Sequence, residues 1–285
     1  MKALTGRGTS QKVACRILGV STRGYRKWLR RPPCQMRVRH QMLSEMIIQI
    51  HAQSRGCYGK RRIWAELTMG MGIQAGREQV GAIMKTLGLR GISGTRKRCM
   101  NRDYLVTHED LVQRNFTANA PNQLWWADIT EHATKEGKLY VCCVIDVFSR
   151  KIVGWAIESR QTTALVLDAL DMAISSRKPH DTIIHSDHGT QFTSWAFTNR
   201  VKEAGLVGSM GTIGDGYDNA LIESFWGKMQ VELLNRKDWT TRTELAGAIF
   251  DYIEIYHNRW RRHSAIDNHT PVEYEQQHPK LQIAS

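Results

Sequence analysis

The sequence predicts an α/β fold, in which a mixed five-stranded sheet with helices on both faces follows an all-α, basic N-terminal part. Strand-like runs at residues 123–130, 139–147 and 152–158 are separated by short turns, and helices then alternate with two further short strands. This order is typical of three antiparallel strands extended by parallel ones. Residues 1–114 instead hold 23 Lys and Arg against 6 Asp and Glu, whereas the remainder holds 17 against 21.

The composition indicates a globular protein that meets a polyanion. The chain has 285 residues, of which 41% are hydrophobic and 24% charged, and a formal net charge of +13. An excess of cations on one half favours nucleic acid as a partner. The longest apolar runs are shorter than the roughly 20 residues that span a bilayer, and no export signal begins the chain. We therefore expect a cytoplasmic protein with reduced cysteines and no membrane partner.

The first DNA-binding candidate covers residues 1–33. Residues 9–31 predict two short helices around a Gly19-Val20-Ser21 turn, with a second helix rich in cations. In a helix-turn-helix the second helix enters the major groove, although any basic amphipathic hairpin gives a similar pattern. The expected DNA contacts on this helix are Arg23, Arg26, Lys27 and Arg30.

A second helical basic region covers residues 41–92. Two helices, at QMLSEMIIQIHAQ and REQVGAIMKTLGL, flank the basic segment YGKRRIWAEL. Its cations either form a solvated face or contact phosphates, and we expect the latter for Lys60, Arg61 and Arg62. The chain then continues through a charged linker (93–120), a core (121–236), and a C-terminal helix and tail (237–285).

The core region continues with elements that alternate in type. Helical patterns are expected at about 162–176, 190–204 and 219–234, with strands at 182–186 and about 206–210 and a helix within 244–260. The adjacent Cys142 and Cys143 are expected to fill the core on opposite faces of a strand.

Acidic residues occur where such a sheet would bring them together. Asp128 lies in the first strand on the same face as Trp126, and Asp187 follows the fourth strand, which is expected to run beside the first. The turn HSDHG also suits an Asp that only caps a turn, so Asp187 alone is ambiguous. Asp146 is expected to bind its own turn through Ser149 or Arg150, and Asp218 to cap the next helix.

The third acid is expected from the long helix at 219–234. Glu223 and Glu232 are nine residues apart and therefore face opposite sides of that helix. Glu223 is closer to the strand ends, so we predict Asp128, Asp187 and Glu223 as the catalytic set and expect Glu232→Gln to remain active. Three converging carboxylates repel one another unless a cation joins them, and their hard oxygens suit Mg²⁺ or Mn²⁺. Two such ions would support phosphoryl transfer on DNA.

The spacing and several ordered motifs resemble a known family. Thirty-five residues separate Asp187 from Glu223, which is the D,D-35-E spacing. The strings RNFTANAPNQLWWADIT, VIDVFSRKIVGWA, HSDHGTQF and GYDNALIESFWGKMQVE resemble OrfB-type transposases of insertion-sequence family three, with a retroviral-integrase-like DDE catalytic core. GVSTRGYRKWLRR and CYGKRRIWAEL resemble the N-terminal helical regions of the same family.

The resemblance implies a ribonuclease H-like core whose three acids hold divalent metal. It also implies DNA strand cleavage and strand transfer in a bacterial, nucleoid-associated protein, terminal inverted repeats as the DNA partner, and a homo-oligomer on paired ends. An upstream reading-frame product, often joined by frameshifting, would be a further partner. The family usually has Lys or Arg seven residues after the catalytic Glu, but here that position is Gln230. Lys228, about 140° off that face, and Arg261 in the terminal segment are the remaining expected DNA contacts.

Two other functions remain open from the sequence. One is a DNA-binding protein with an inert core, which would bind DNA without metal-dependent cutting. The other is a structure-selective nuclease of the same fold, which would cut DNA without strand transfer. The three acids argue against the first, and selectivity for one repeat sequence would separate the second from a transposase.

Overall fold

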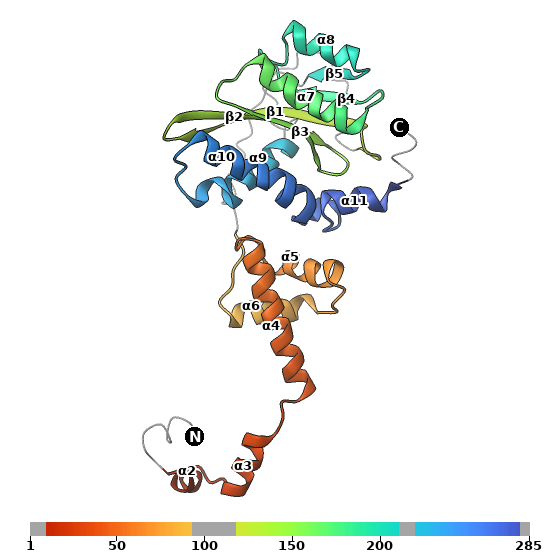
Figure 1. The fold of residues 1–285 in the computed structure, drawn as a ribbon. Coiled ribbons are helices and arrows are strands. Elements are labelled where there is room, and N and C mark those ends of the chain that lie inside the picture. The colour runs from red at the N-terminus through yellow and green to blue at the C-terminus, as the bar shows by residue number, and fades with distance from the viewer. Residues whose placement is uncertain (1–9, 93–117, 211–219, 280–285) are drawn as a thin grey trace, which may run out of the picture. The chain divides into compact units, whose positions relative to one another are not determined.

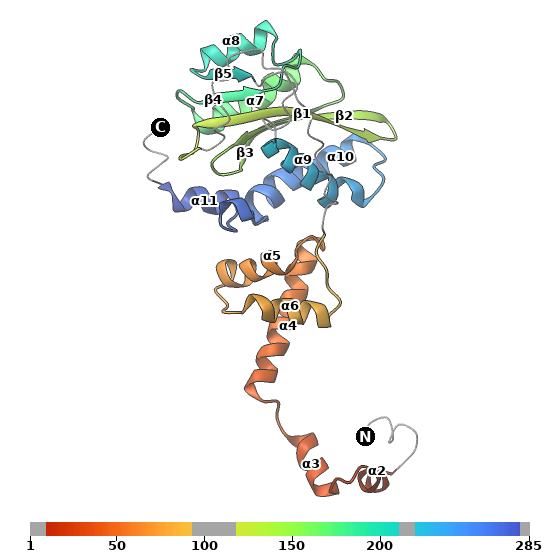
Figure 2. The ribbon, with the colours of Figure 1, turned by 180° about the vertical axis from the view of Figure 1, so that it is seen from behind.

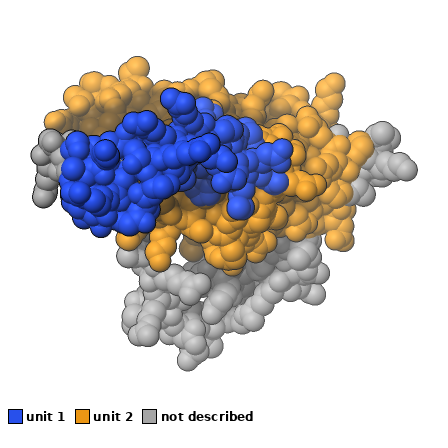
Figure 3. Space-filling model, turned by 90° about the horizontal axis from the view of Figure 1, so that it is seen from below, with its two compact units in different colours: residues 1–49 blue, residues 50–285 orange. Residues whose placement is uncertain are grey.

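The computed structural model of the chain describes residues 10–92, 118–210 and 220–279. The chain divides into two compact units, Met1–Gln49 and Ile50–Ser285, which Figure 3 shows in blue and orange. The glycine-rich loop before the long helix, the expected cap Asp218 and nearly all of the expected linker lie outside the described residues.

The first unit contains the two short helices that the sequence predicts. Helix α2 (Gln11–Ile17) and helix α3 (Thr22–Arg30) begin at serine caps: the Ser10 and Ser21 hydroxyls accept hydrogen bonds from backbone amides three residues on. Gly19 has a φ of 64°, which glycine adopts without strain, and it turns the chain between the helices. Helix α4 (Gln35–Gln53) follows and begins six residues before the expected helix.

The second unit begins with short helices. They are α5 (Lys60–Ala65), the π-helical η1 (Glu66–Gly70) and α6 (Arg77–Thr86). Hydrogen bonds join them to the C-terminal part of the chain: the Tyr58 hydroxyl donates to the Trp260 carbonyl at 3.0 Å and accepts from the Arg262 amide at 2.8 Å. The Arg262 guanidinium donates to Glu66 at 2.5 Å. Segments about 200 residues apart therefore belong to one compact body.

The five-stranded mixed sheet that the sequence predicts is confirmed. Its order is β3 (Ile152–Glu158), β2 (Gly137–Asp146), β1 (Leu124–Thr134), β4 (Ile183–Ser186) and β5 (Val207–Met210). The first three strands pair antiparallel, and β4 and β5 join them in parallel (Figure 1). The tight β2–β3 turn depends on Asp146, which accepts hydrogen bonds from the Ser149 amide and hydroxyl, as expected.

Helices cover both faces of the sheet (Figures 1 and 2). Helices α7 (Thr163–Arg177) and α8 (Trp195–Glu203) pack on one face, and α9 (Ala220–Glu232) and α10 (Arg242–Phe250) pack on the other. Alternate residues of β1 and β2, such as Trp125 and Cys142, are buried in the core with α7. Gly154 lets α7 approach β3, because a Cβ there would lie 2.1 Å from the Ala169 carbonyl oxygen.

Besides α4, two helical regions differ from their expected limits. Helix α8 begins at Trp195 instead of about residue 190, because the chain turns at 189–194 and the Ser194 hydroxyl then caps the helix. The expected helix at 244–260 is observed as α10 followed without a break by the π-helical segment η3 (Asp251–Trp260).

Short elements complete the chain. They are η2 (Leu234–Arg236), η4 (Ser264–Ile266) and α11 (Pro271–Gln277). No helix in the described ranges is long and apolar enough to cross a membrane. The five cysteines that the structure describes are free thiols, and Cys142 and Cys143 are fully buried, as expected.

Candidate active site

The parallel pairing of β1 with β4 brings two of the predicted acids together. Trp126 lies beside His185 and Ala127 beside Ser186 in this register. One further residue along both strands places Asp128 next to Asp187. Asp187 itself follows the end of β4. Asp128 lies on the same face of β1 as Trp126, the face that α9 covers.

A hydrogen bond from α9 fixes this helix over Asp128. The indole Nε1 of Trp226 donates to Asp128 Oδ2 at 2.8 Å. Glu223 precedes Trp226 by three residues, a spacing that places both side chains on the same side of a helix. Glu223 and Asp187 are exposed, whereas Asp128 is partly buried. The alternative turn role of Asp187 is also observed, since its Oδ1 accepts from the Gly189 amide at 2.9 Å.

The charges of Asp187 and Glu223 act on Asp128. Burial raises the pKa of Asp128 to about 6, and repulsion from Asp187 and Glu223 adds to this, although hydrogen bonds from Trp226 and the Ile129 amide oppose it. Like charges raise a carboxyl pKa only when they are close. These contributions indicate that Asp187 and Glu223 lie near Asp128, close to the carboxyl end of β4.

The donor set of this site fits a divalent cation. Three carboxylates and no thiol or thioether are the hard oxygen ligands that Mg²⁺ and Mn²⁺ take, and a cation would offset the repulsion acting on Asp128. The chemistry of the set fits, but no three His, Cys, Asp or Glu side chains of the described residues, these three acids included, lie close enough together in this structure to hold an ion.

Glu232, the competing acid, is buried among cations. Arg261 donates to both of its oxygens at 2.7 Å, and further bonds come from Tyr252 (3.0 Å) and Arg62 (3.3 Å). Burial alone would raise the pKa of Glu232, but Arg261 and then Arg62 lower it overall. Through these partners Glu232 stabilises the packing of the fold, and it lies away from the three acids.

Arg261 requires a correction. The sequence places it in a basic segment and predicts a DNA contact, but its side chain is only 1% exposed and is held by Glu232. A guanidinium committed to a buried carboxylate does not face DNA at the surface. Lys228, on α9, is partly buried, and burial lowers its pKa to about 8.

The other predicted DNA contacts lie nearer the surface. On α3 the cations Arg23, Arg26, Lys27 and Arg30 are all exposed. On α5 Lys60 and Arg61 are exposed and Arg62 is partly buried.

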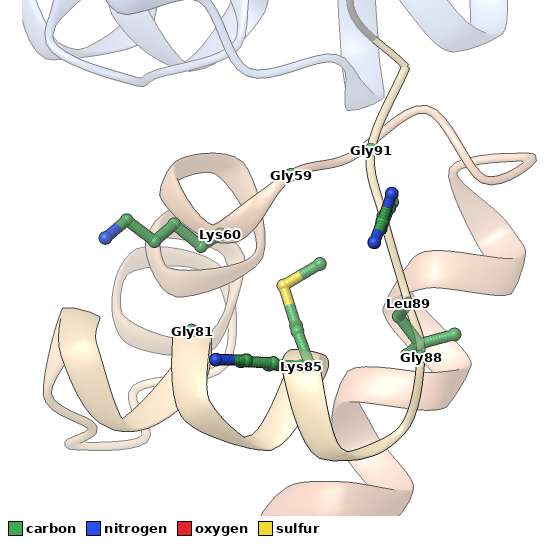
Figure 4. A pocket seen from close by; sticks show the side chains of 9 residues that line it. Gly59, Lys60, Gly81, Lys85, Gly88, Leu89 and Gly91 are labelled. Atoms are coloured by element: carbon green, nitrogen blue, oxygen red, sulfur yellow. The ribbon is translucent and has the colours of Figure 1, made fainter.

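Lys60 lines a hollow of about 550 Å³ that is rich in glycine. Lys85 and Arg90 line the same hollow, and Figure 4 shows Gly59 and Gly91 close together at its edge. Lys60 also pairs with Glu78 at 2.8 Å. This pair is exposed, so it leaves the amine accessible to solvent.

Trp226 and Arg150 are site residues that sequence reasoning did not identify. Trp226 bonds to Asp128, 98 residues away in the chain. Arg150, in the β2–β3 turn, has a φ of 65° and points into a cavity beside α9. A tryptophan one turn after the predicted catalytic Glu was the available signal for Trp226; no signal marked Arg150.

Family models match most of the described chain. Two models described as "Integrase core domain" match residues 118–215 and 223–278, and one described as "HTH-like domain" matches residues 39–98. With the mixed sheet and its acidic edge, these matches define an α/β, ribonuclease H-like polynucleotidyl transferase with an integrase-type core, a class that uses divalent metal.

Curated relatives specify the family. The chain is 40% identical over 222 residues to the transposase of insertion sequence IS629 from Shigella sonnei, covering 78% of this chain and 75% of the relative. It is 36% identical to the IS904 transposase of Lactococcus lactis (87% and 98% covered) and 34% identical to the IS3A transposase InsF of Escherichia coli (93% and 94% covered). The chain belongs to this family of IS3-type insertion-sequence transposases, whose function is DNA transposition by an integrase-like DDE core.

The comparison with solved structures gives a distant likeness. The integrase catalytic core of HTLV-2 is 18% identical, with a TM-score of 0.44, and the match covers 56% of this chain and 99% of that one.

Proposed function

We propose that this transposase cuts and joins DNA at the ends of a bacterial insertion sequence, with Asp128, Asp187 and Glu223 as its catalytic, metal-holding acids. The observation that carries the proposal is the β1–β4 register, which ends one residue before Asp128 and Asp187, together with the bond from Trp226 of α9 to Asp128. Glu223 lies on the same helix. The repulsion that Asp187 and Glu223 exert on Asp128 supports a single site.

Each acid has its own role in this scheme. Asp187 and Glu223 are exposed and meet the scissile phosphate, while Trp226 orients Asp128 at the closed side of the site. Two divalent ions, Mg²⁺ or Mn²⁺, when bound, would activate the attacking oxygen and stabilise the leaving oxygen of an in-line phosphoryl transfer. The attacking group is water for cleavage and a DNA 3′-hydroxyl for strand transfer.

The N-terminal regions supply DNA recognition. Residues 1–33 read the terminal inverted repeats through the exposed cations of α3, and residues 41–92 add backbone contacts through α5. Residues 93–120 link these regions to the catalytic core at 121–236 and the C-terminal part at 237–285. The protein works on nucleoid DNA as a homo-oligomer on paired ends, with the upstream reading-frame product as a partner or fusion.

The test is cleavage and joining of labelled DNA that carries the source element's ends, in Mg²⁺ or Mn²⁺. Asp128→Asn, Asp187→Asn and Glu223→Gln should abolish products while leaving DNA binding near that of the unaltered protein. Glu158→Gln is the matched control, since Glu158 is an exposed acid at the end of β3. DNA binding without products from the unaltered protein, also when fused to the upstream frame, would identify an inert DNA-binding protein instead.

A further inference from the structure

A cationic cavity of about 360 Å³ lies beside the proposed catalytic acids. It is bounded by β1 and β2, by α9, by the segment after η3 and by α5, and its lining includes Arg62, Trp126, Arg150, Ser224, Lys228 and His263. Trp126 lies two residues before Asp128, and Ser224 follows Glu223 directly. The cationic cavity and the acids therefore share one strand and one helix.

The cationic cavity holds more positive than negative charge. Four cations line it, Arg62, Arg150, Lys228 and Arg261, and Arg261 and Arg62 share a single carboxylate, that of Glu232. Among the described residues, no carboxylate forms an ion pair with Arg150 or Lys228. Cations on an open surface need no partner, but Lys228 and Arg150 are both partly buried. Glu232 and Asp146 attract Lys228 and Arg150 without forming ion pairs with them. Four cations thus face two carboxylates, and because excess charge away from water is costly, the cationic cavity favours an added anion.

Unused hydrogen-bond donors lie at the same place. The Nε of Arg150 is buried and has no partner within the described part of the chain. The same holds for Nε2 of His263, a residue only 5% exposed. His263 Nδ1 faces Arg261 Nη1 at 3.4 Å, and because arginine can only donate, the proton of a neutral His263 is on Nε2. Both of these groups are therefore donors, which an anion satisfies. A third buried atom of the lining, Nδ1 of His257, is an acceptor, because His257 Nε2 donates to the Arg150 carbonyl.

Part of the lining of the cationic cavity is open to solvent. Ser224, Ser264 and Ala265 are exposed, whereas Arg261 and His263 are buried. Ser224 directly follows Glu223 in α9, so an exposed part of the lining adjoins the proposed catalytic Glu223 in the chain.

We propose that the cationic cavity binds a phosphate of the DNA strand that is cut, a phosphate near the scissile one, with Lys228 and Arg150 as its positioning residues. The inference rests on the proposed function and deepens it. A phosphate carries the charge and the several acceptor oxygens that these donors require. Holding a neighbouring phosphate fixes the strand, so that the scissile phosphate lies at the acids. The family's usual cation position is Gln230 here, and Lys228 supplies a cation from a different face of α9.

The first experiment measures the binding of end DNA by the full chain at several salt concentrations. Lys228→Gln and Arg150→Gln should each weaken binding about tenfold and lower the salt slope by about 0.9, the value for one lost phosphate contact. Lys202→Gln is the matched control, because Lys202 is exposed on α8, on the opposite face of the sheet. Equal effects of Lys228→Gln and Lys202→Gln would overturn the proposal.

The second experiment identifies the phosphate. Neutral methylphosphonates replace the phosphates near the scissile position one at a time, and one replacement should weaken binding to the unaltered protein but cause no further loss in Lys228→Gln. Additive losses at every position would overturn the proposal. Because the Lys228 side chain makes no hydrogen bond within the described residues, this variant remains usable if Arg150→Gln does not fold.

Two further measurements separate the possible outcomes. Calorimetry with inorganic phosphate and no DNA tests whether the cationic cavity binds free phosphate instead of a DNA phosphate. If Lys228→Gln removes tight binding of inorganic phosphate but leaves DNA binding unchanged, the cationic cavity binds a free anion and the proposal is overturned. Glu223→Gln should lose cleavage, but the same methylphosphonate should still weaken its DNA binding, and should do so only when Lys228 is present. The DNA-binding measurements therefore test the cationic cavity even if the proposed catalytic function is wrong.

Discussion

Replacing Glu232 by glutamine removes the carboxylate that Arg261 and Arg62 share, while nearly keeping the size of the side chain. Arg261 is 1% exposed and Glu232 7%, so water cannot compensate the arginine that remains. Removing one partner of a buried ion pair costs about 3–5 kcal/mol. The hydrogen bond from the Tyr252 hydroxyl survives to the amide oxygen. We therefore expect Glu232→Gln to lose about 3–5 kcal/mol of its free energy of unfolding.

The assay is urea unfolding followed by tryptophan fluorescence. Glu131→Gln is the control, because Glu131 pairs with Lys138 at the surface and such exposed pairs contribute about 0–1 kcal/mol. The double variant Glu232→Met, Arg261→Met should recover most of the loss, since apolar side chains can replace a buried pair. A loss below about 1 kcal/mol in Glu232→Gln would refute the reasoning. The fraction that stays folded should still cut DNA, because Glu232 does not face the three acids.

Three further changes test other contacts. Trp226→Phe keeps the ring but removes the donor to Asp128, so the single-turnover cleavage rate should fall about tenfold with DNA affinity unchanged; an unchanged rate would show that the bond does not orient the acid. Gly154→Ala drives a methyl group into the α7 backbone, should cost about 1–3 kcal/mol or more, and should lower Tm by several degrees in a thermal scan. Burial would raise the pKa of Glu275, but its hydrogen bond and ion pair with Arg177 (2.5 Å) lower it overall. A depressed carboxyl pKa stabilises the fold above about pH 4.3, and the gain disappears as pH falls through the lower folded value. Unfolding midpoints measured from pH 7 to 3 should therefore fall less steeply in Glu275→Gln than in the unaltered protein.

Most of the fold could be predicted from short-range sequence patterns. The alternation in QLWWADIT and the turns KEGK and FSRK are short-range signals, and β1, β2 and β3 follow them closely. The two helices around Gly19 likewise follow from serine caps and a glycine turn. The parallel neighbourhood of Asp128 and Asp187 follows from the order of the elements, because β4 after a crossover helix joins β1 in the expected sheet.

Long-range pairing could not be predicted from one sequence. The string RWRRH looks like a surface run of cations, yet Arg261 is buried because Glu232, 29 residues earlier, faces it across the C-terminal packing. Periodicity places a residue on a face of its own helix but does not identify the opposing element. For the same reason the Trp226–Asp128 bond and the position of Arg150 became evident only from the coordinates.

The bonds that join Tyr58 and Glu66 to Trp260 and Arg262 bear on where a foreign recognition module could be grafted. A chimera that took its N-terminal helices from one relative and its remainder from another, with the junction after Ile92, would separate these partners, and Arg262 would keep Glu273 but lose its bond to Glu66. A junction between α3 and α4, at residues 31–34, leaves these bonds and helix α4 intact. Grafting a foreign recognition module is therefore best done at this upstream junction.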